Sequence, residues 1–313
     1  MSEPICLGLD TSNYTTSIAV FDGERGENIG RLLDVPAGTL GLRQSDALFQ
    51  HVKRLPELFD TLRTQGLLHG IKAVGASTRP RAVEGSYMPC FLAGEGQGRA
   101  LADCLDAPFF PVSHQQGHLA AAAWSAGHME LLSRPMLAWH LSGGTTELLH
   151  VEPDGVNVKA TCIGGTSDIS AGQLIDRAGV LLGLPFPAGR VLDTLAAQSD
   201  SDDCFCVKLN DFVFSLSGVE NKIKAFAEQG KPATYIAHFA LSTVADAVRR
   251  TTIAALEQYP GLPVLCSGGV ASNTLLRSVM ANAIFAEPRY STDNAMGVAI
   301  LAWRSLHNGE GRA

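Results

Sequence analysis

Two patterns of apolar and polar positions recur along the chain, and together they predict an α/β protein. Short apolar runs bounded by turn residues, such as ICLGL at residues 5–9 and MLAW at 136–139, are typical of buried β-strands. Longer amphipathic segments lie between such runs, and the clearest of them, residues 41–63, predicts a surface helix that packs on the first half of the chain. Its apolar positions at near-helical spacing are Leu48, Val52, Leu55 and Leu58.

One predicted β-hairpin occurs twice. The segment Asp10–Gly23 resembles His140–Gly155 when the two are aligned on their threonine pairs, which lie 130 positions apart. Each copy follows a predicted buried strand, bends at small polar residues and is followed by a further β-prone segment and by helical stretches. An internal repeat of this kind indicates two α/β halves, which we expect at residues 1–130 and 131–313.

A duplicated α/β fold that opens each half with such a hairpin resembles the actin, sugar-kinase and Hsp70 superfamily, whose two lobes flank a nucleotide cleft. The small residues of the turn Ser142–Gly144 allow backbone N–H groups to approach a phosphate. A second glycine turn, Gly268-Gly269, follows the apolar run LPVLCS and precedes a predicted helix, in which Asn273 is a candidate to hydrogen-bond a ribose or a base. Asp10 ends the first predicted strand, where such folds place a carboxylate near metal or phosphate.

Composition, charge and cysteine usage exclude several classes of protein. Of the 313 residues, 46% are hydrophobic and 18% are charged, as in a folded globular chain. The net charge of −7 is opposite to that of proteins that hold nucleic acid by themselves, so an RNA partner would require a local basic patch or a partner subunit. The seven cysteines include no CxxC pair, which argues against a disulfide framework or a thiolate zinc site. The chain lacks a signal-peptide pattern and an apolar run of about 20 residues, so we expect a cytoplasmic protein that does not enter a membrane.

A pair of histidines, His114 and His118, begins a predicted helix that follows the short predicted strand FFPVS. Ser113 is a favourable N-cap, and the four-residue spacing puts both imidazoles on one helical face, where they can share a metal. Gln115 occupies the place of the glutamate that a zinc protease requires as general base, so proteolysis is disfavoured. Asp293 precedes an apolar helix near the end of the chain and offers a carboxylate, and a His-His-Asp set suits iron or zinc equally well.

These segments together resemble the TsaD/Gcp family of tRNA threonylcarbamoyladenosine transferases, formerly described as glycoproteases, in family order over about residues 5–303. The matching blocks are LGLDTSNYTTSIAV, SHQQGHLAA, LSGGTTEL, GGTSDISAGQLIDRAGVLLGLPFPAG, FSLSG, CSGGVASNTLLR and STDNAMGVA. No single block is specific to the family, whereas their combination is. The resemblance implies a two-lobed actin/sugar-kinase/Hsp70-like fold and an acyltransferase.

The resemblance also implies a set of ligand-binding positions. The family's three metal ligands fall on His114, His118 and Asp293. Its substrate or nucleotide contacts fall on His140, Leu141, Ser142, Gly143, Gly144, Asp176, Gly189 and Asn273. Further candidates for phosphate or metal contact are Asp10, Gly268 and Gly269. No side chain is assigned as a covalent nucleophile.

The family transfers a threonylcarbamoyl group from threonylcarbamoyl-AMP to N6 of adenosine 37 in tRNAs that read codons starting with A. The resemblance therefore implies a nucleotide ligand, threonylcarbamoyl-AMP or ATP, and one divalent metal, iron or zinc, that polarises the transferred group. Glycine-turn amides would hold the phosphate as it becomes part of the leaving group, and the adenosine amine would attack directly. The resemblance also implies that tRNA binds with the help of partner subunits, either a TsaB-like chain or a second copy paired through the helix at 41–63.

Several positions depart from the family pattern on the acceptor side. The family's Cys-Asp-Glu after Thr-Ser is replaced by Asn13–Thr15, and its Gly-Pro-Gly segment by residues 77–89, which introduce Arg79 and Arg81. Its lysine, second aspartate and glutamate fall on Glu220, Ile169 and Gln173. We therefore expect a divergent bacterial paralogue that keeps the metal and nucleotide chemistry and acts on tRNA, on another acceptor or on none.

Two further functions are compatible with the fold. An ATP-binding phosphotransferase or ATPase of the same superfamily would not need the histidine pair. A non-catalytic partner subunit of a true transferase would have no physical reason to keep three metal ligands. Both hypotheses are therefore less favoured than group transfer, and metal analysis together with a tRNA-modification assay would separate them.

Overall fold

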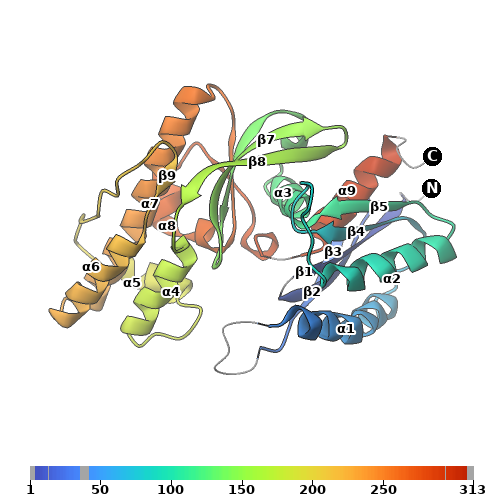
Figure 1. The fold of residues 1–313 in the computed structure, drawn as a ribbon, viewed down its shortest axis with the longest axis horizontal. Helices are drawn as coiled ribbons and strands as arrows, with labels where there is room; N and C mark the ends of the chain where they lie inside the picture. The colour runs from blue at the N-terminus through green and yellow to red at the C-terminus, as the bar shows by residue number, and fades with distance from the viewer. Residues whose placement is uncertain (1–3, 13, 36–41, 293, 309–313) are drawn as a thin grey trace. The chain divides into compact units, whose positions relative to one another are not determined.

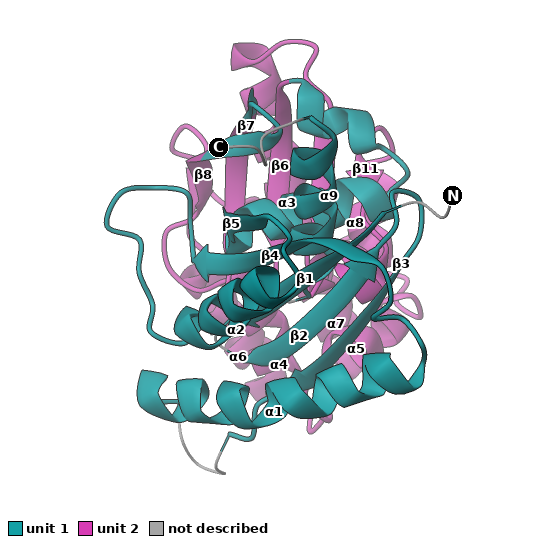
Figure 2. Cartoon of the chain, turned by 90° about the vertical axis from the view of Figure 1, so that its right-hand side faces the viewer, with its two compact units in different colours: residues 1–134, 152–160, 293–313 teal, residues 135–151, 161–292 magenta. Residues whose placement is uncertain are grey.

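The computed structural model describes residues 4–12, 14–35, 42–292 and 294–308, which belong to two compact units (Figure 2). Unit 1 comprises residues 1–134, 152–160 and 293–313, and unit 2 comprises residues 135–151 and 161–292. The lobe boundary predicted between residues 130 and 131 stays a prediction. Within the described ranges, no helix is both long enough and apolar enough to cross a membrane.

Unit 1 is built on a five-stranded sheet with the strand order β3-β2-β1-β4-β5 (Figure 1). β2 is antiparallel to both β1 and β3, β4 is parallel to β1, and β5 is parallel to β4. The strands are β1 (Ile5–Ser12), β2 (Thr15–Phe21), β3 (Gly26–Leu32), β4 (Ile71–Arg79) and β5 (Phe109–Ser113). The helices are α1 (Gln44–Thr64), α2 (Phe91–Cys104), α3 (His114–Ser125), the 3-10 turn η1 (Met129–Ser133) and α9 (Met296–His307).

Helices cover both faces of this sheet, because successive residues of a strand point to opposite sides. Gly75 of β4 faces α9, where an added Cβ would lie 3.1 Å from the Cβ of Ala302. The next residue, Ala76, faces α2, where Gly98 leaves room for it and for Leu9 of β1. The C-terminal helix α9 is therefore an integral layer of unit 1.

Unit 2 is built on a six-stranded sheet with the strand order β11-β10-β6-β7-β8-β9. The strands are β6 (Met136–Leu141), β7 (Thr146–Asp154), β8 (Asn157–Thr166), β9 (Val213–Phe214), β10 (Val264–Ser267) and β11 (Ile284–Phe285). The helices are α4 (Ala171–Leu181), α5 (Gly189–Ala196), α6 (Ser217–Glu228), α7 (Ala233–Gln258), α8 (Thr274–Val279) and the 3-10 turns η2 (Gly269–Ser272) and η3 (Pro288–Tyr290). Trp139, Leu174 and Leu241 belong to the large core that joins β6, α4 and α7.

The two sheets share one topology, and this confirms the internal repeat. Each starts with three neighbouring strands that are consecutive in sequence, β1-β2-β3 or β6-β7-β8. Each then continues from its first strand into two parallel strands, β4 and β5 or β10 and β11. Among the described residues, β9 has no counterpart in the first sheet.

Helix α1 confirms the amphipathic helix predicted at 41–63, but the predicted packed face was partly wrong. Val52 is 54% exposed and does not belong to that face. The preceding residue, His51, is fully buried instead, with its Nδ1 2.8 Å from Thr16 Oγ1 of β2. Arg54 is buried on the same side of the helix. Polar side chains therefore fill part of the contact between α1 and the sheet, because β2 offers a hydroxyl there.

Candidate functional site

The histidine pair lies at the start of α3, which begins directly after β5. Ser113 caps this helix: its Oγ accepts a hydrogen bond from Gln116 N (3.2 Å), and Gln116 Oε1 accepts one from Ser113 N (2.8 Å). The amide of Gln116 also donates to the carbonyl of Val158 (2.9 Å). These bonds confirm the predicted N-cap, and they fix the first turns of the helix, which hold His114 and His118.

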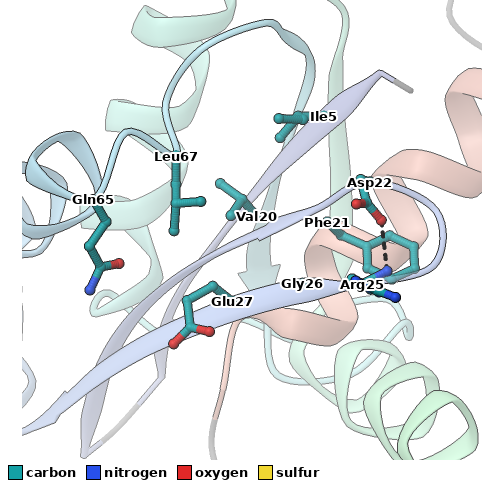
Figure 3. A pocket seen from close by; sticks show the side chains of 9 residues that line it. All are labelled: Ile5, Val20, Phe21, Asp22, Arg25, Gly26, Glu27, Gln65 and Leu67. Atoms are coloured by element: carbon teal, nitrogen blue, oxygen red, sulfur yellow. Dashed lines mark hydrogen bonds between the residues drawn. The ribbon is translucent and has the colours of Figure 1, made fainter. Parts of the chain in front are cut away.

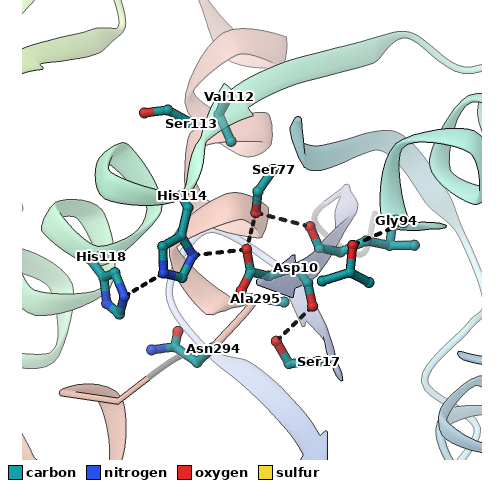
Figure 4. Close-up of polar contacts among 12 residues, drawn as sticks. Asp10, Ser17, Ser77, Gly94, Val112, Ser113, His114, His118, Asn294 and Ala295 are labelled. Atoms are coloured by element: carbon teal, nitrogen blue, oxygen red, sulfur yellow. Dashed lines mark hydrogen bonds and ion pairs between the residues drawn. The ribbon is translucent and has the colours of Figure 1, made fainter. Parts of the chain in front are cut away.

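The rings of His114 and His118 point toward each other (Figure 4). Their Nε2 atoms lie 2.9 Å apart, and His114 Nδ1 lies 3.0 Å from Oδ1 of Asp10, a fully buried carboxylate near the end of β1. Ser77 of β4 also donates its hydroxyl to Asp10 Oδ1. When the Nδ1–H of His114 donates to this carboxylate, its Nε2 keeps a lone pair. Histidines that bind a metal through Nε2 have this arrangement.

Two of the three predicted metal ligands are therefore adjacent. The third, Asp293, lies outside the described residues, and no group of three His, Cys, Asp or Glu side chains that could hold a metal is found within them. The residues that follow it are well anchored: Ala295 N donates to Asn28 Oδ1 (3.0 Å), and Asn294 Oδ1 accepts from Met296 N (3.1 Å). The first bond ties the start of α9 to β3, and the second closes the first turn of the helix itself.

The substituted segment 77–89 adjoins the same turn of α3. Arg79 is paired with Ser113 in the register of β4 and β5, and the carbonyl of Pro80 accepts a hydrogen bond from Gln115 N (3.0 Å). Arg79 and Arg81 are both exposed. The departure from the family pattern at this segment therefore changes the surface beside the histidine pair.

In unit 2, the glycine turn between β6 and β7 packs on the N-terminus of α4. Ser142 N donates to the carbonyl of Thr145 (2.8 Å) and closes the turn. Ser170, the N-cap of α4, donates its hydroxyl to the carbonyl of Gly143 (2.6 Å). Gly172 makes this approach possible, because a Cβ at that position would lie 2.5 Å from Gly143 Cα.

A pocket of about 560 Å³ lies beside this turn and brings together residues that are far apart in sequence. The predicted ligand-binding residues that line it are Gly143, Asp176, Gly189, Gly269 and Asn273. The predicted positions outside this lining are His140, Leu141, Ser142, Gly144 and Gly268, together with Asp10 in unit 1. Arg190 and Asp193 also line the pocket, and the sequence analysis missed both.

Backbone and side-chain donors hold the two carboxylates of the pocket in place. Asp176 Oδ1 accepts a hydrogen bond from Ala188 N (2.8 Å). Asp193 Oδ1 accepts from Asn273 Nδ2 (3.0 Å) and from Thr274 N (3.1 Å). Asn273 also caps α8 through its side chain, so one residue joins α5, α8 and the pocket wall. The only sequence signal for Asp193 is its position one helical turn after Gly189.

Two acidic residues, Glu220 at a departure from the family pattern and Asp168 beside another, are satisfied by neighbouring groups. Glu220 of α6 pairs with Lys224 (2.6 Å) and Arg177 (2.6 Å), and these two cations lower the pKa of its carboxyl. Burial opposes ionisation of Asp168, but hydrogen bonds led by that of the Ser215 hydroxyl outweigh it and hold its pKa well below the usual range. The negative charge at 220 is thus part of an ion-pair network.

A second pocket, of about 530 Å³, lies in unit 1 beside the turn between β2 and β3 (Figure 3). Ile5, Val20 and Leu67 contribute its apolar lining, and Asp22 and Arg25 contribute charge. The carboxylate of Asp22 accepts a hydrogen bond from Arg25 N (2.7 Å), so it serves the turn itself. None of the described residues that line this pocket was predicted to bind a ligand, and we do not include it in the candidate site.

Comparisons with known proteins agree with this picture. The chain matches the family profile described as TsaD, tRNA N6-adenosine threonylcarbamoyltransferase, over residues 45–300. A tRNA N6-adenosine threonylcarbamoyltransferase from Thermus thermophilus is 31% identical over 97% of this chain and 93% of its own.

The solved structure of full-length HypF in its phosphate- and nucleotide-bound form superposes with a TM-score of 0.60 and 13% identity, over 98% of this chain and 56% of that one. The ROK hexokinase from Thermus thermophilus gives a TM-score of 0.50 and 16% identity, over 97% of this chain and 100% of its own. The likeness to these structures confirms the predicted actin/sugar-kinase/Hsp70-like fold.

Proposed function

We propose, since this chain belongs to the TsaD family of tRNA N6-adenosine threonylcarbamoyltransferases, that it transfers a threonylcarbamoyl group from threonylcarbamoyl-AMP to N6 of adenosine 37 in tRNA. The predicted acyltransferase class agrees with the family. The observation that carries the proposal is the pair His114–His118 with the buried carboxylate of Asp10 behind His114. This arrangement brings two ring nitrogens together on partly exposed side chains, and a buried carboxylate fixes the orientation of one ring.

The side chains at the histidine pair fit a divalent metal. Imidazole nitrogens suit iron and zinc alike, and two Nε2 atoms 2.9 Å apart can bind one ion at the usual metal–nitrogen distance of about 2.0–2.1 Å. We assign His114, His118 and Asp293 as the ligands, and Asp10 as the residue that orients His114. The metal would polarise the threonylcarbamoyl group as a Lewis acid.

The pocket of unit 2 supports binding of the adenylate. Nothing lies within 4 Å of a Cβ added to Gly143 or Gly269, so a phosphate can approach their backbone N–H groups closely. Donors of this kind stabilise the negative charge that develops on the leaving AMP. Asp176 and Asp193 are hydrogen-bond acceptors and suit ribose hydroxyls. The N6 amine of adenosine attacks the carbonyl directly, so this scheme requires no covalent nucleophile from the protein.

Binding of tRNA is proposed to need a partner subunit, either a TsaB-like chain or a second copy of this one. The net charge of −7 disfavours tight binding of a polyanion by the chain alone. Helix α1 is the proposed docking element, because Phe49 and Val52 on its outer face are 64% and 54% exposed.

A second candidate function is transfer of the same group to another acceptor. The observation that favours it is Glu220, which pairs with Arg177 and Lys224 where the family pattern has a lysine. The metal and nucleotide sites would work in the same way in either case. Only the acceptor would differ.

Complementation tests the proposed function. The chain is expressed in a bacterial strain depleted of its own TsaD, and threonylcarbamoyladenosine in bulk tRNA is measured by mass spectrometry. We expect the wild-type chain to restore the modification and His114→Ala to fail, whereas His128→Ala, a change at an exposed histidine of the same unit, restores it. Failure of the wild-type chain, with metal and nucleotide still bound, would support the second candidate.

A further inference from the structure

Arg190 is the one cationic side chain among the described residues that line the pocket of unit 2. Within the described part of the chain, its guanidinium makes no hydrogen bond or ion pair, although Asp176 and Asp193 line the same pocket. An arginine that lines a pocket and leaves its five donors to solvent is available to a ligand. Neither the sequence analysis nor the family pattern assigned a role to this residue.

The backbone that carries Arg190 is held on both sides. Ala188, two residues earlier, donates its N–H to Asp176, and Asp193, one helical turn later, accepts hydrogen bonds from Asn273 and Thr274. Helix α5 therefore holds a fixed position against α4 and α8. These bonds restrain the backbone on both sides of Arg190 and leave its guanidinium available to a ligand.

The charges around Arg190 indicate which part of a nucleotide it meets. Asp176 and Asp193 take part in the hydrogen bonds that hold the backbone on either side of Arg190. Their negative charges would repel a phosphate placed between them. The phosphate-binding groups are instead the N–H groups of the glycine turns at Gly143 and Gly269. A phosphate held at the glycine turns leaves the nucleoside as the part of the ligand for Arg190 to meet.

We propose that Arg190 contacts the nucleobase of the bound nucleotide, with its planar guanidinium stacked on the face of the purine. This inference rests on the proposed function only in that the pocket holds an adenylate. A guanidinium stacks well on an aromatic ring, because the group is flat, delocalised and only weakly hydrated. The contact covers an exposed side chain without requiring an ion pair. It makes Arg190 a determinant of affinity for the nucleoside.

Calorimetric titration of the full chain with adenosine and, separately, with AMP tests this assignment. We expect Arg190→Ala to weaken both ligands by the same factor, roughly 5- to 20-fold, because the base is common to both. Arg190→Lys should be nearly as weak as Arg190→Ala, since an ammonium group cannot stack as a plane. The matched control is Arg249→Ala, which removes an arginine of α7 that pairs with Asp246 and does not line the pocket.

Three outcomes would overturn the assignment. A loss confined to AMP, largely rescued by Arg190→Lys, would mean that Arg190 binds the phosphate. Unchanged affinities for both ligands would mean that it does not touch the nucleotide. Absence of binding by the wild-type chain would overturn both this inference and the proposed adenylate pocket.

Binding is measured without tRNA, so a chain that binds adenosine normally but does not modify tRNA contradicts the proposed function alone. Thermal unfolding of each variant confirms that it is folded.

Discussion

The first strands of the two units end in the same way but carry different chemistry. In unit 1, Asp10 accepts a hydrogen bond from Ser77 of β4, and the same hydroxyl lies 3.5 Å from the carbonyl of the residue before Asp10. In unit 2, His140 is paired with Ser267 of β10, whose hydroxyl donates to the carbonyl of the residue before His140 (3.2 Å). One scaffold position, 130 residues apart in the repeat, thus holds a buried carboxylate in one unit and an imidazole in the other.

The segment that follows the parallel strand differs between the two units. In unit 1, β4 leads through residues 77–89 into α2, where Gly94 N donates to Thr11 Oγ1 (3.1 Å) and covers the end of β1. In unit 2, β10 leads into Gly268, which has a positive φ of 95° and packs on the carbonyl of Leu141. A glycine turn in place of a covering helix leaves backbone N–H groups open to a ligand. In the proposed function, one duplicated sheet would therefore orient a metal ligand in one half and bind a nucleotide in the other.

The largest expected difference between the units is in their response to pH. In unit 2, Thr146 accepts a hydrogen bond from the backbone N–H of Ala171 (2.8 Å), whereas in unit 1 the corresponding residue of the repeat, Thr16, bonds to His51. Burial lowers the pKa of His51 from 6.5 to about 4. The unfolded chain then takes up a proton near pH 6.5 and the folded chain only near pH 4. The free energy of unfolding should therefore fall by about 3 kcal/mol between pH 6.5 and pH 4 because of His51.

Chemical denaturation at several pH values checks this expectation. His51→Gln should lose this part of the pH dependence, whereas His69→Gln, a change at an exposed histidine, should keep it. If His51→Gln and the wild type show the same slope over this range, the buried neutral histidine is not the source.

Asp10→Asn tests whether the carboxylate of unit 1 serves the histidine pair. A neutral amide accepts the hydrogen bond of His114 Nδ1 more weakly and makes Nε2 a poorer ligand, so metal affinity should fall by about 10- to 100-fold. The dissociation constants for Zn²⁺ and Fe²⁺ measure the effect directly. Asp60→Asn, which removes an exposed carboxylate of α1, should leave both constants unchanged. Equal affinities in Asp10→Asn and the wild type would mean that Asp10 has only a structural role.

The smallest expected effects on stability come from enlarging the glycines that pack against the two hairpin turns. Gly172→Ala would bring its Cβ to 2.5 Å from backbone atoms of the Ser142–Gly144 turn and should cost about 1–2 kcal/mol and weaken AMP binding. Gly94→Ala meets the side chain of Thr11 at 2.9 Å, which can adjust, and should cost less. Gly218→Ala, with nothing within 4 Å, is the neutral control. Thermal unfolding and AMP titration rank the three variants, and a Gly172→Ala protein as stable as the control would contradict the close packing.

Much of the fold followed from local signals in the sequence. The capping residue Ser113 and the repeated hairpin depend on neighbouring residues, so a sequence pattern contains them. Gln173 also has a local role, because it completes the capping box of α4 with Ser170 where the family pattern has a glutamate. By contrast, apolar spacing favoured Val52 as a packed residue of α1, whereas a hydroxyl on β2 made a buried histidine favourable one position earlier.

The site depended on contacts that no local pattern contains. Asp10 lies behind His114 although 104 residues separate them, and Asp193 holds Asn273 across 80 residues. Only the folded sheet order brings such residues together. The sequence could propose Asp10 as a metal or phosphate contact, but it could not predict the hydrogen bond that orients His114. Arg190 was missed for the same reason, since its neighbours in the pocket come from five other segments of the chain.

Transfer of the threonylcarbamoyl group by the purified chain is the most direct test of the proposed function. The protein, loaded with metal and mixed with synthetic threonylcarbamoyl-AMP, unmodified tRNA and the candidate partner subunit, is assayed for threonylcarbamoyladenosine by mass spectrometry of tRNA digests. We expect modified tRNA with the wild-type chain and at least 100-fold less with His114→Ala, which loses a proposed metal ligand, while His128→Ala matches the wild type. Equal product from His114→Ala and the wild type would contradict this expectation.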